Sequence, residues 1–240
     1  MKIMSFNTQH CLNYLEQKID FQVMADAVKQ CGADIVGLQE MRDVGNRPDY
    51  AAQTKILSEL TGLKYYYFAE AIRFDGGVNP YGNGLLSKYP IISAKSIPIP
   101  DPVEKTGTDL YETRCVLKAK LEGGITVLVT HFGLNPDEHK NAMATVLENI
   151  EDEKCILMGD FNMQPDNALF QPLTARMKDT AALFDGPRFS IPSDAPDRKI
   201  DYIFVSQDVE IVEADIPAIV ASDHRPHTAV VNIQSRETVL

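Results

Sequence analysis

The sequence predicts an α/β protein in which two stacked β-sheets are flanked by helices. Many short β-like segments and a few amphipathic helices follow one another, and no repeat, low-complexity tract or linker divides the chain. Such a pattern favours two sheets that pack face to face, with helices covering their outer faces. A chain of 240 residues can bury a substantial core, and we expect a single domain over residues 1–240.

The three predicted helices are recognised from apolar spacing and from the residues at their ends. Residues 19–31 carry an apolar side chain at every fourth position, and Gly32 supplies a C-terminal stop. A second helix is expected over residues 49–61. A third is expected over residues 136–150, with Asn135 as its N-cap and a proline in its first turn.

The remaining regular segments are short β-like runs separated by turn-forming residues. Three longer segments, 73–83, 98–113 and 185–199, contain Gly, Pro or Asp and are expected to be loops that wall a functional site. The predicted strands cover residues 2–6, 35–39, 63–69, 84–87, 91–98, 116–122, 125–130, 154–158, 200–205, 209–215 and 227–233.

Polar side chains recur where these apolar strands end. Because ligands and catalytic groups collect at strand ends in α/β sheets, this recurrence predicts an enzyme. The chain has no Gly-x-Ser-x-Gly elbow and no Walker or dinucleotide-binding loop, which argues against a serine hydrolase or such a nucleotide-binding protein. The polar residues in question are Asn7, Glu40, His131, Asp160, Asn162, Asp201, Asp223 and His224.

Several of these residues also have a purely structural interpretation. Asn7 could be a turn residue at a strand end, and Asp160 with Asn162 could form an Asx-turn. Asp201 sits inside an apolar strand, where an unpaired acid is costly, so it needs a partner in any case. His224 and a second histidine three residues later have the spacing of a zinc pair, but a proline intervenes and no third ligand is evident.

Composition limits the partners that the protein can bind. A formal net charge of −11 argues against broad, sequence-independent binding to a nucleic-acid backbone, although a local arginine cluster would be compatible with it. No apolar run has the length of a membrane span, and the N-terminus lacks a signal-peptide pattern, so a cytoplasmic location is expected. The four scattered cysteines are expected to be buried free thiols. His10 and His139 are expected to lie on the surface.

The polar motifs, taken in order, resemble those of the endonuclease/exonuclease/phosphatase superfamily of metal-dependent phosphoesterases. The resemblance extends from Met4 to about Val231, and residues 82–91 and 189–203 match small bacterial members. It implies a DNase I-like four-layered α/β sandwich of two mixed sheets, with the site at one end. The motifs are Ser-Phe-Asn at 5–7, Leu-Gln-Glu at 38–40, Thr-His at 130–131, Gly-Asp-Phe-Asn at 159–162, Ile-Asp-Tyr-Ile at 200–203 and Ser-Asp-His at 222–224.

The resemblance implies hydrolysis of a phosphate ester by in-line attack of water, with Mg²⁺ or Mn²⁺ as cofactor. Glu40 is the expected metal ligand, with Asn7 near it and Asp223 as a possible contributor. Oxygen ligands of this kind suit a hard ion such as Mg²⁺, independently of the resemblance. Asn83 and Arg114 are expected to contact the substrate.

The catalytic roles carried over from the family fall on five residues. Asp160 is expected to position or deprotonate the attacking water, and Asn162 to hold that water or a phosphate oxygen. His224, oriented by Asp201, is expected to stabilise the transition state. A buried Asp beside a His fixes the tautomer of the imidazole and favours the cationic form of the imidazole. His131 is expected to be a second phosphate donor.

Two departures from the family concern the DNA-repair members. Those members typically carry an acid two residues after the first Asn, where this chain has Gln9, and commonly a Trp before it, where this chain has Phe6. Together with the acidic balance, these differences disfavour a DNA-repair role. We therefore expect a phosphorylated small-molecule or lipid substrate, and no protein partner is predicted. The alternatives are a nuclease acting on DNA or RNA and an inactive module that binds a phosphate ligand or a protein.

Overall fold

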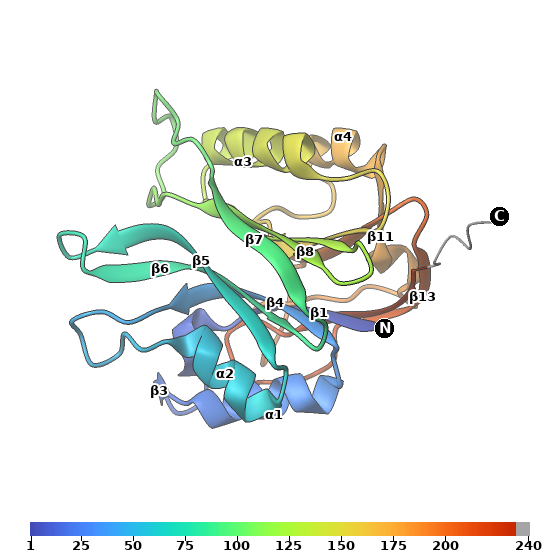
Figure 1. Cartoon of the computed structure of the whole chain (residues 1–240). Coiled ribbons are helices and arrows are strands. Elements are labelled where there is room, and N and C mark those ends of the chain that lie inside the picture. Colours follow the sequence, from blue (N-terminus) through green and yellow to red (C-terminus); the bar gives the residue numbers. More distant parts are fainter. Residues whose placement is uncertain (234–240) are drawn as a thin grey trace.

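The computed structural model describes residues 1–233, and these residues form four layers, helix, sheet, sheet and helix (Figure 1). This arrangement confirms the predicted sandwich of two mixed sheets flanked by helices. The first sheet contains, in spatial order, β13 (Glu210–Asp215), β14 (His227–Asn232), β1 (Lys2–Asn7), β4 (Ile35–Arg42), β6 (Asn79–Ser87) and β5 (Tyr65–Phe74). The second contains β11 (Met177–Asp179), β12 (Asp201–Ser206), β10 (Cys155–Asp160), β9 (Thr126–His131), β8 (Cys115–Leu121) and β7 (Ile91–Pro98).

The helices cover the two outer faces of the sandwich (Figure 1). Helices α1 (Phe21–Cys31) and α2 (Gln53–Thr61) lie over the first sheet, and α3 (Pro136–Asn149) with the short α4 (Gln171–Thr174) lies over the second. A two-stranded hairpin, β2 (Leu12–Asn13) and β3 (Lys18–Ile19), precedes α1. Three short 3₁₀ turns complete the fold, η1 (Gln9–Cys11), η2 (Ala168–Phe170) and η3 (Thr180–Leu183).

Apolar side chains fill the three spaces between these layers. Ile3, Leu85, Val127 and Ile156 belong to the cluster between the sheets. The central strands are buried on both faces, which explains their continuous apolar runs. The four cysteines are buried free thiols, as predicted. Among the described residues, no helix is both long enough and apolar enough to cross a bilayer.

Strand direction brings the polar strand ends to one edge of the sandwich. β1 runs parallel to β4, and β9 runs parallel to β10, so the C-terminal ends of these pairs point the same way. β12 is antiparallel to β10, and its first residue, Asp201, lies directly opposite Asp160, the last residue of β10. The sequence therefore folds so that polar side chains from six distant segments gather around one point.

The largest difference from the sequence prediction concerns residues 73–83. This segment was expected to be a loop, but it forms the end of β5, a tight turn and the start of β6. Gly76 and Gly77, with φ of +75° and +93°, provide the turn conformation that only glycine adopts freely. The prediction was wrong because the Asn, Pro and Gly residues of 79–84 are ladder positions between β4 and β5, not turn residues.

The helices begin later than their apolar spacing indicated. Ile19 pairs with Leu12 in the β2–β3 hairpin, and α1 starts only after Asp20, whose carboxylate caps the amides of Gln22 and Val23. The second helix starts at Gln53 and not at residue 49. The preceding residues are held in a loop, where Asp49 bonds Arg42 at 2.5 Å.

Helix α3 begins where it was predicted, but one of its residues, His139, is buried and not exposed as expected. Asn135 is the N-cap, and its amide N–H donates to the Glu138 carboxylate at 3.1 Å. His139 was expected on the surface but is buried, with Nε2 2.9 Å from the carbonyl of Gly133. The segments 98–113 and 185–199 are largely irregular, as predicted. Within the second segment, Ile191 and Arg198 form an isolated antiparallel bridge.

Candidate active site

Left-handed backbone at non-glycine residues marks the strand ends that carry the site. Glu40 has φ of +61° and sits where the pairing of β4 with β6 shifts register. Asn162, just past β10, has φ of +49°, and residues 9–11, just past β1, have φ of +46° to +64°. Such conformations cost free energy, and they persist where packing over-determines them, often at functional sites. Here they turn the polar side chains toward the common edge of the two sheets.

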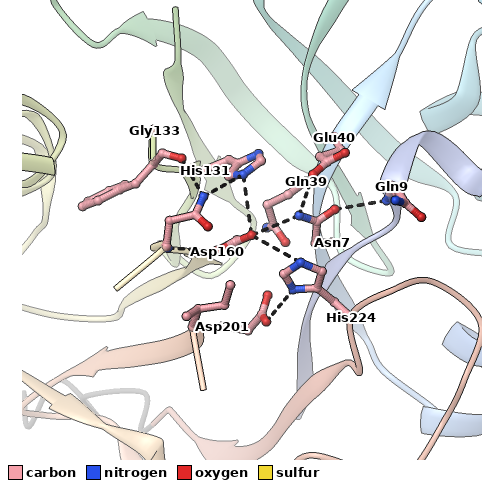
Figure 2. A network of polar contacts seen from close by, with 12 residues as sticks. Asn7, Gln9, Gln39, Glu40, His131, Gly133, Asp160, Asp201 and His224 are labelled. Atoms are coloured by element: carbon pink, nitrogen blue, oxygen red, sulfur yellow. Dashed lines mark hydrogen bonds and ion pairs between the residues drawn. The ribbon is translucent and has the colours of Figure 1, made fainter. Parts of the chain in front are cut away.

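Asn7 joins the two sheets at this edge (Figure 2). Its side-chain amide donates to Glu40 Oε1 at 3.0 Å and to Asp160 Oδ2 at 3.1 Å. Its carbonyl oxygen accepts from the backbone amide of Gln9 at 3.0 Å. Because all the hydrogen-bonding atoms of this fully buried side chain are engaged, Asn7 holds the two carboxylates in a fixed relation.

Asp160 is the centre of the network. Its Oδ2 lies 3.5 Å from His131 Nε2 and 3.7 Å from His224 Nε2, and its Oδ1 accepts from the backbone amide of Asn162 at 2.9 Å. Burial and the nearby charge of Asp201 raise the pKa of Asp160 to about 7, against the opposing effect of His224. A carboxyl group with this pKa can exchange a proton near neutral pH.

His224 and Asp201 form a buried carboxylate–imidazole pair. Nδ1 of His224 lies 2.8 Å from Asp201 Oδ2, which confirms that this acid has the partner its burial requires. Burial alone would lower the pKa of His224, but Asp201 and Asp160 outweigh it and raise the pKa to about 10. The imidazole is therefore cationic at neutral pH and can donate from Nε2 toward the space beside Asp160.

His131 lies on the other side of Asp160, in the opposite electrostatic environment. Its Nδ1 is 3.0 Å from Arg114 Nη1, and Arg114 is ion-paired with Glu112 at 2.5 Å. Burial and the positive charge of Arg114 lower the pKa of His131 well below its usual value. The site thus contains one cationic and one neutral imidazole on either side of the same carboxylate.

The oxygen donors that could hold a cation lie around Glu40. Burial alone would raise the pKa of Glu40, but His10, His131 and the Asn7 amide reverse this and place it well below its usual value, so the carboxylate is charged. Burial raises the pKa of Asp223, and the charge of Glu40 raises it further. Two partly buried carboxylates that repel each other fit a hard divalent cation, which would relieve that repulsion.

A second set of possible ligand atoms lies deeper in the site. One atom each from Asp160, Asp201 and His224 come within 4.8 Å of one another. However, Oδ2 of Asp201 and Nδ1 of His224 already engage each other at 2.8 Å, which leaves Oδ1 of Asp201 as its one unpartnered oxygen among the described residues. Glu40 and Asp223 offer only oxygen ligands, and these suit Mg²⁺ or Mn²⁺ better than a set that contains an imidazole.

Seven predicted site residues, Asn7, Glu40, His131, Asp160, Asn162, Asp201 and His224, meet in one network (Figure 2), and Arg114 adjoins it through His131. Two others lie at its margin. Asn83 is buried in β6 and donates to the carbonyl of Cys115 in β8 at 3.0 Å, so it ties the sheets together. Asp223 accepts from the Ser222 hydroxyl at 2.9 Å.

Sequence reasoning missed two residues of the site. Glu112 holds Arg114, but it lies in an irregular segment that carries no local pattern. His10 was interpreted as a surface residue, yet its side chain is only 23% exposed, and its Nδ1 lies 3.9 Å from Glu40 Oε2. Its position just after the first strand-end Asn was the one available signal.

The model of the endonuclease/exonuclease/phosphatase family matches residues 4–224 of this chain. The chain belongs to this family. Its members are hydrolases of phosphate esters and generally use divalent metal ions. Family membership therefore accounts for the order of the motifs and for the edge at which they meet.

Known relatives support the same fold over nearly the whole chain. The uncharacterized protein YbhP of Escherichia coli K12 is 24% identical over 251 residues, covering 97% of this chain and 96% of YbhP. A family protein from Beutenbergia cavernae superposes with a TM-score of 0.75 at 19% identity, covering 98% of this chain and 72% of that one. The mannosyl-6-phosphatase Bt3783 of Bacteroides thetaiotaomicron gives 0.73 at 16% identity, covering 97% and 100%.

Proposed function

We propose that this protein is a phosphoesterase, dependent on Mg²⁺ or Mn²⁺, that hydrolyses a phosphomonoester or phosphodiester by in-line attack of water. The observation that carries the proposal is the buried network in which Asp160 meets Asn7, His131 and His224 while Asn7 also holds Glu40. It combines a carboxyl group of near-neutral pKa, one cationic and one neutral imidazole, and a charged carboxylate that suits a cation. This combination is what phosphoryl transfer requires.

Glu40 would hold the metal, with Asn7 and Asp223 beside it. The ion would neutralise charge on the phosphoryl oxygens as water attacks. Glu40 is suited to this role because it is ionised and because its left-handed backbone turns it toward the site. Asn7 supports it by bonding the same carboxylate at 3.0 Å.

Asp160 would orient the attacking water and accept its proton, since its pKa of about 7 allows both protonation states near neutral pH. Asn162 keeps Asp160 in place through its backbone amide and would hold the water or a phosphate oxygen. His224, kept cationic by Asp201, would donate to a non-bridging oxygen and stabilise the charge that develops there.

The charge around the site supports a small or lipid-type phosphate substrate over a nucleic acid. A phosphate backbone needs a continuous run of free cations. Here five arginines in and near the segments that carry the site are each paired with an acid, while Arg225 donates to the carbonyl of Ser193. The mannosyl-6-phosphatase among the structural neighbours acts, by its name, on a phosphorylated sugar, which is consistent with a small substrate. The paired arginines are Arg42 with Asp49, Arg47 with Asp75, Arg73 with Glu70, Arg114 with Glu112 and Arg198 with Asp197.

Hydrolysis of p-nitrophenyl phosphate and bis-p-nitrophenyl phosphate tests the proposal. Release of nitrophenol is expected with Mg²⁺ or Mn²⁺, and neither with EDTA nor with the Asp160→Asn variant. The ester that reacts faster identifies the substrate class. Release that persists at full rate in EDTA or in Asp160→Asn would contradict the proposal. If neither ester reacts, calorimetric titration with Mg²⁺ decides: binding that Glu40→Ala abolishes is expected, and no binding would contradict the metal site.

A further inference from the structure

The two histidines of the site meet partners of opposite charge on the same ring nitrogen. Nδ1 of His224 faces a carboxylate oxygen of Asp201 at 2.8 Å. Nδ1 of His131 faces a guanidinium nitrogen of Arg114 at 3.0 Å. Because the partner of Nδ1 determines which ring nitrogen carries the proton, the two imidazoles present different chemistry to the space between them.

The guanidinium group restricts His131 to one tautomer. Arginine has five N–H donors and no acceptor, and it stays protonated in proteins. A ring nitrogen 3.0 Å from it must therefore accept, so Nδ1 of His131 carries no proton. The neutral imidazole then carries its proton on Nε2, the nitrogen that points to Asp160 Oδ2 at 3.5 Å.

One further contact to His131 has to be reconciled with this tautomer. Nε2 also lies 3.3 Å from the side-chain nitrogen of Asn162. That nitrogen donates to the Phe132 carbonyl at 3.0 Å, which identifies it as the NH₂ group and uses one of its hydrogens. The Asn162 contact is longer, and the second hydrogen of the Asn162 NH₂ group can point away from His131. The guanidinium group of Arg114, in contrast, has only N–H donors to present to Nδ1. The Arg114 contact therefore decides the tautomer.

Arg114 is itself held in place by Glu112. The two side chains are only 11% and 13% exposed, and they form an ion pair at 2.5 Å. The guanidinium carbon also lies 6.0 Å from the centre of the Tyr81 ring. A buried, charge-balanced arginine keeps one geometry, and its charge discourages a second proton on the neighbouring imidazole.

We propose that Arg114, anchored by Glu112, is a positioning residue that fixes His131 as a neutral imidazole with its proton on Nε2, from which His131 donates to a phosphoryl oxygen of the substrate. This inference rests on the proposed function and assigns Arg114 a role different from substrate contact. It also gives the two histidines different roles. His224 offers a charged donor and His131 a neutral one, so the site stabilises developing negative charge with only one cationic imidazole.

Two-bond ¹H–¹⁵N NMR correlations of ¹⁵N-histidine-labelled protein with Mg²⁺ read the tautomer directly. The signals of His131 are identified by their loss in His131→Ala. Near pH 7.5, we expect a protonated Nε2 and an unprotonated Nδ1 in the wild-type protein. In Glu112→Gln/Arg114→Met, which removes both charges of the pair, we expect a mixture of tautomers. A proton on Nδ1 in the wild type, or an unchanged Nε2–H tautomer in the double variant, would overturn the proposal.

Arg114→Lys provides a second test if the double variant does not fold. Lysine is also a pure donor, so the Nε2–H tautomer should be retained, and an Nδ1–H tautomer there would count against the proposal. These spectra need no turnover. A failure of the proposed hydrolysis is therefore distinguishable from a failure of the tautomer assignment.

Kinetics separate positioning from direct substrate contact. With the nitrophenyl ester that the enzyme hydrolyses, Glu112→Gln/Arg114→Met should lower kcat by ~10-fold or more and change KM by less than about threefold. In a His131→Ala background, the same pair of substitutions should change kcat by less than about twofold, because Arg114 acts through His131. An equal loss in both backgrounds, or an effect confined to KM, would show direct contact with substrate and overturn the proposal.

Discussion

Replacement of Asp201 by Asn should move the pH dependence of kcat toward acid on both of its limbs. In the wild-type enzyme, activity is expected to rise as Asp160 loses its proton near pH 7 and to fall as His224 loses its proton near pH 10. The carboxylate of Asp201 raises both of these pKa values. Asn keeps the shape and an acceptor oxygen but removes the charge, so both pKa values should fall.

The size of the effect follows from the contact between Asp201 and His224. A charge this close to a buried imidazole, at 2.8 Å, typically changes a pKa by roughly 1–3 units, so the alkaline limb should move to lower pH by a similar interval. The acid limb should move less, since burial is the largest cause of the raised pKa of Asp160. At pH 8, a fall of this size leaves His224 between mostly charged and about one-tenth charged, so kcat should drop by up to ~10-fold from the loss of charge.

The assay is a kcat profile from pH 5 to 9.5 on the preferred nitrophenyl ester at saturating Mg²⁺. The wild-type alkaline limb, near pH 10, lies above this range, and the alkaline limb of Asp201→Asn should fall within it. Asp152→Asn is a matched control, because the Asp152 side chain is 86% exposed and lies in a surface ion pair. The control should reproduce the wild-type profile. If the limbs of Asp201→Asn stay in place or move toward alkaline pH, the electrostatic role assigned to Asp201 is wrong.

Three further predictions test the metal site, the transition-state donor and the core. Glu40→Ala should sharply weaken metal-dependent turnover, whereas Glu148→Ala on the exposed face of α3 should not; an unchanged kcat at saturating Mg²⁺ would refute the assignment. His224→Ala should lower kcat by ~10²-fold or more in steady-state assays, and full retention would remove His224 from the mechanism. Phe161 is fully buried, and the centroids of four aromatic rings lie 4.6–5.6 Å from the centroid of its ring. Phe161→Ala should therefore lower the free energy of unfolding by ~3–5 kcal/mol and Tm by roughly 6–20 °C. A drop in Tm of less than about 3 °C in a calorimetric scan would contradict this.

The strands near the site could be predicted because their sequence pattern is local. The largely apolar residues 155–159 and 125–129 are each followed directly by a polar residue, and such a run is the pattern of a strand buried on both faces. The hairpin of β5 and β6 could not be predicted in this way. Its Asn, Pro and Gly residues indicate turns, and only pairing with β4 and β5 makes residues 79–84 a strand.

By itself, the sequence determined the α/β class, the order of the motifs and the chemical type of each group at the strand ends. Only the tertiary structure decided which groups meet, because the partners lie far apart along the chain. Asn7 and Asp160 are 153 residues apart, yet one hydrogen bond of 3.1 Å joins them. No local pattern could show that His131 faces Arg114 while His224 faces Asp201. Those contacts make one imidazole cationic and the other neutral, since a ring nitrogen responds to the nearest charge and not to its neighbours in sequence.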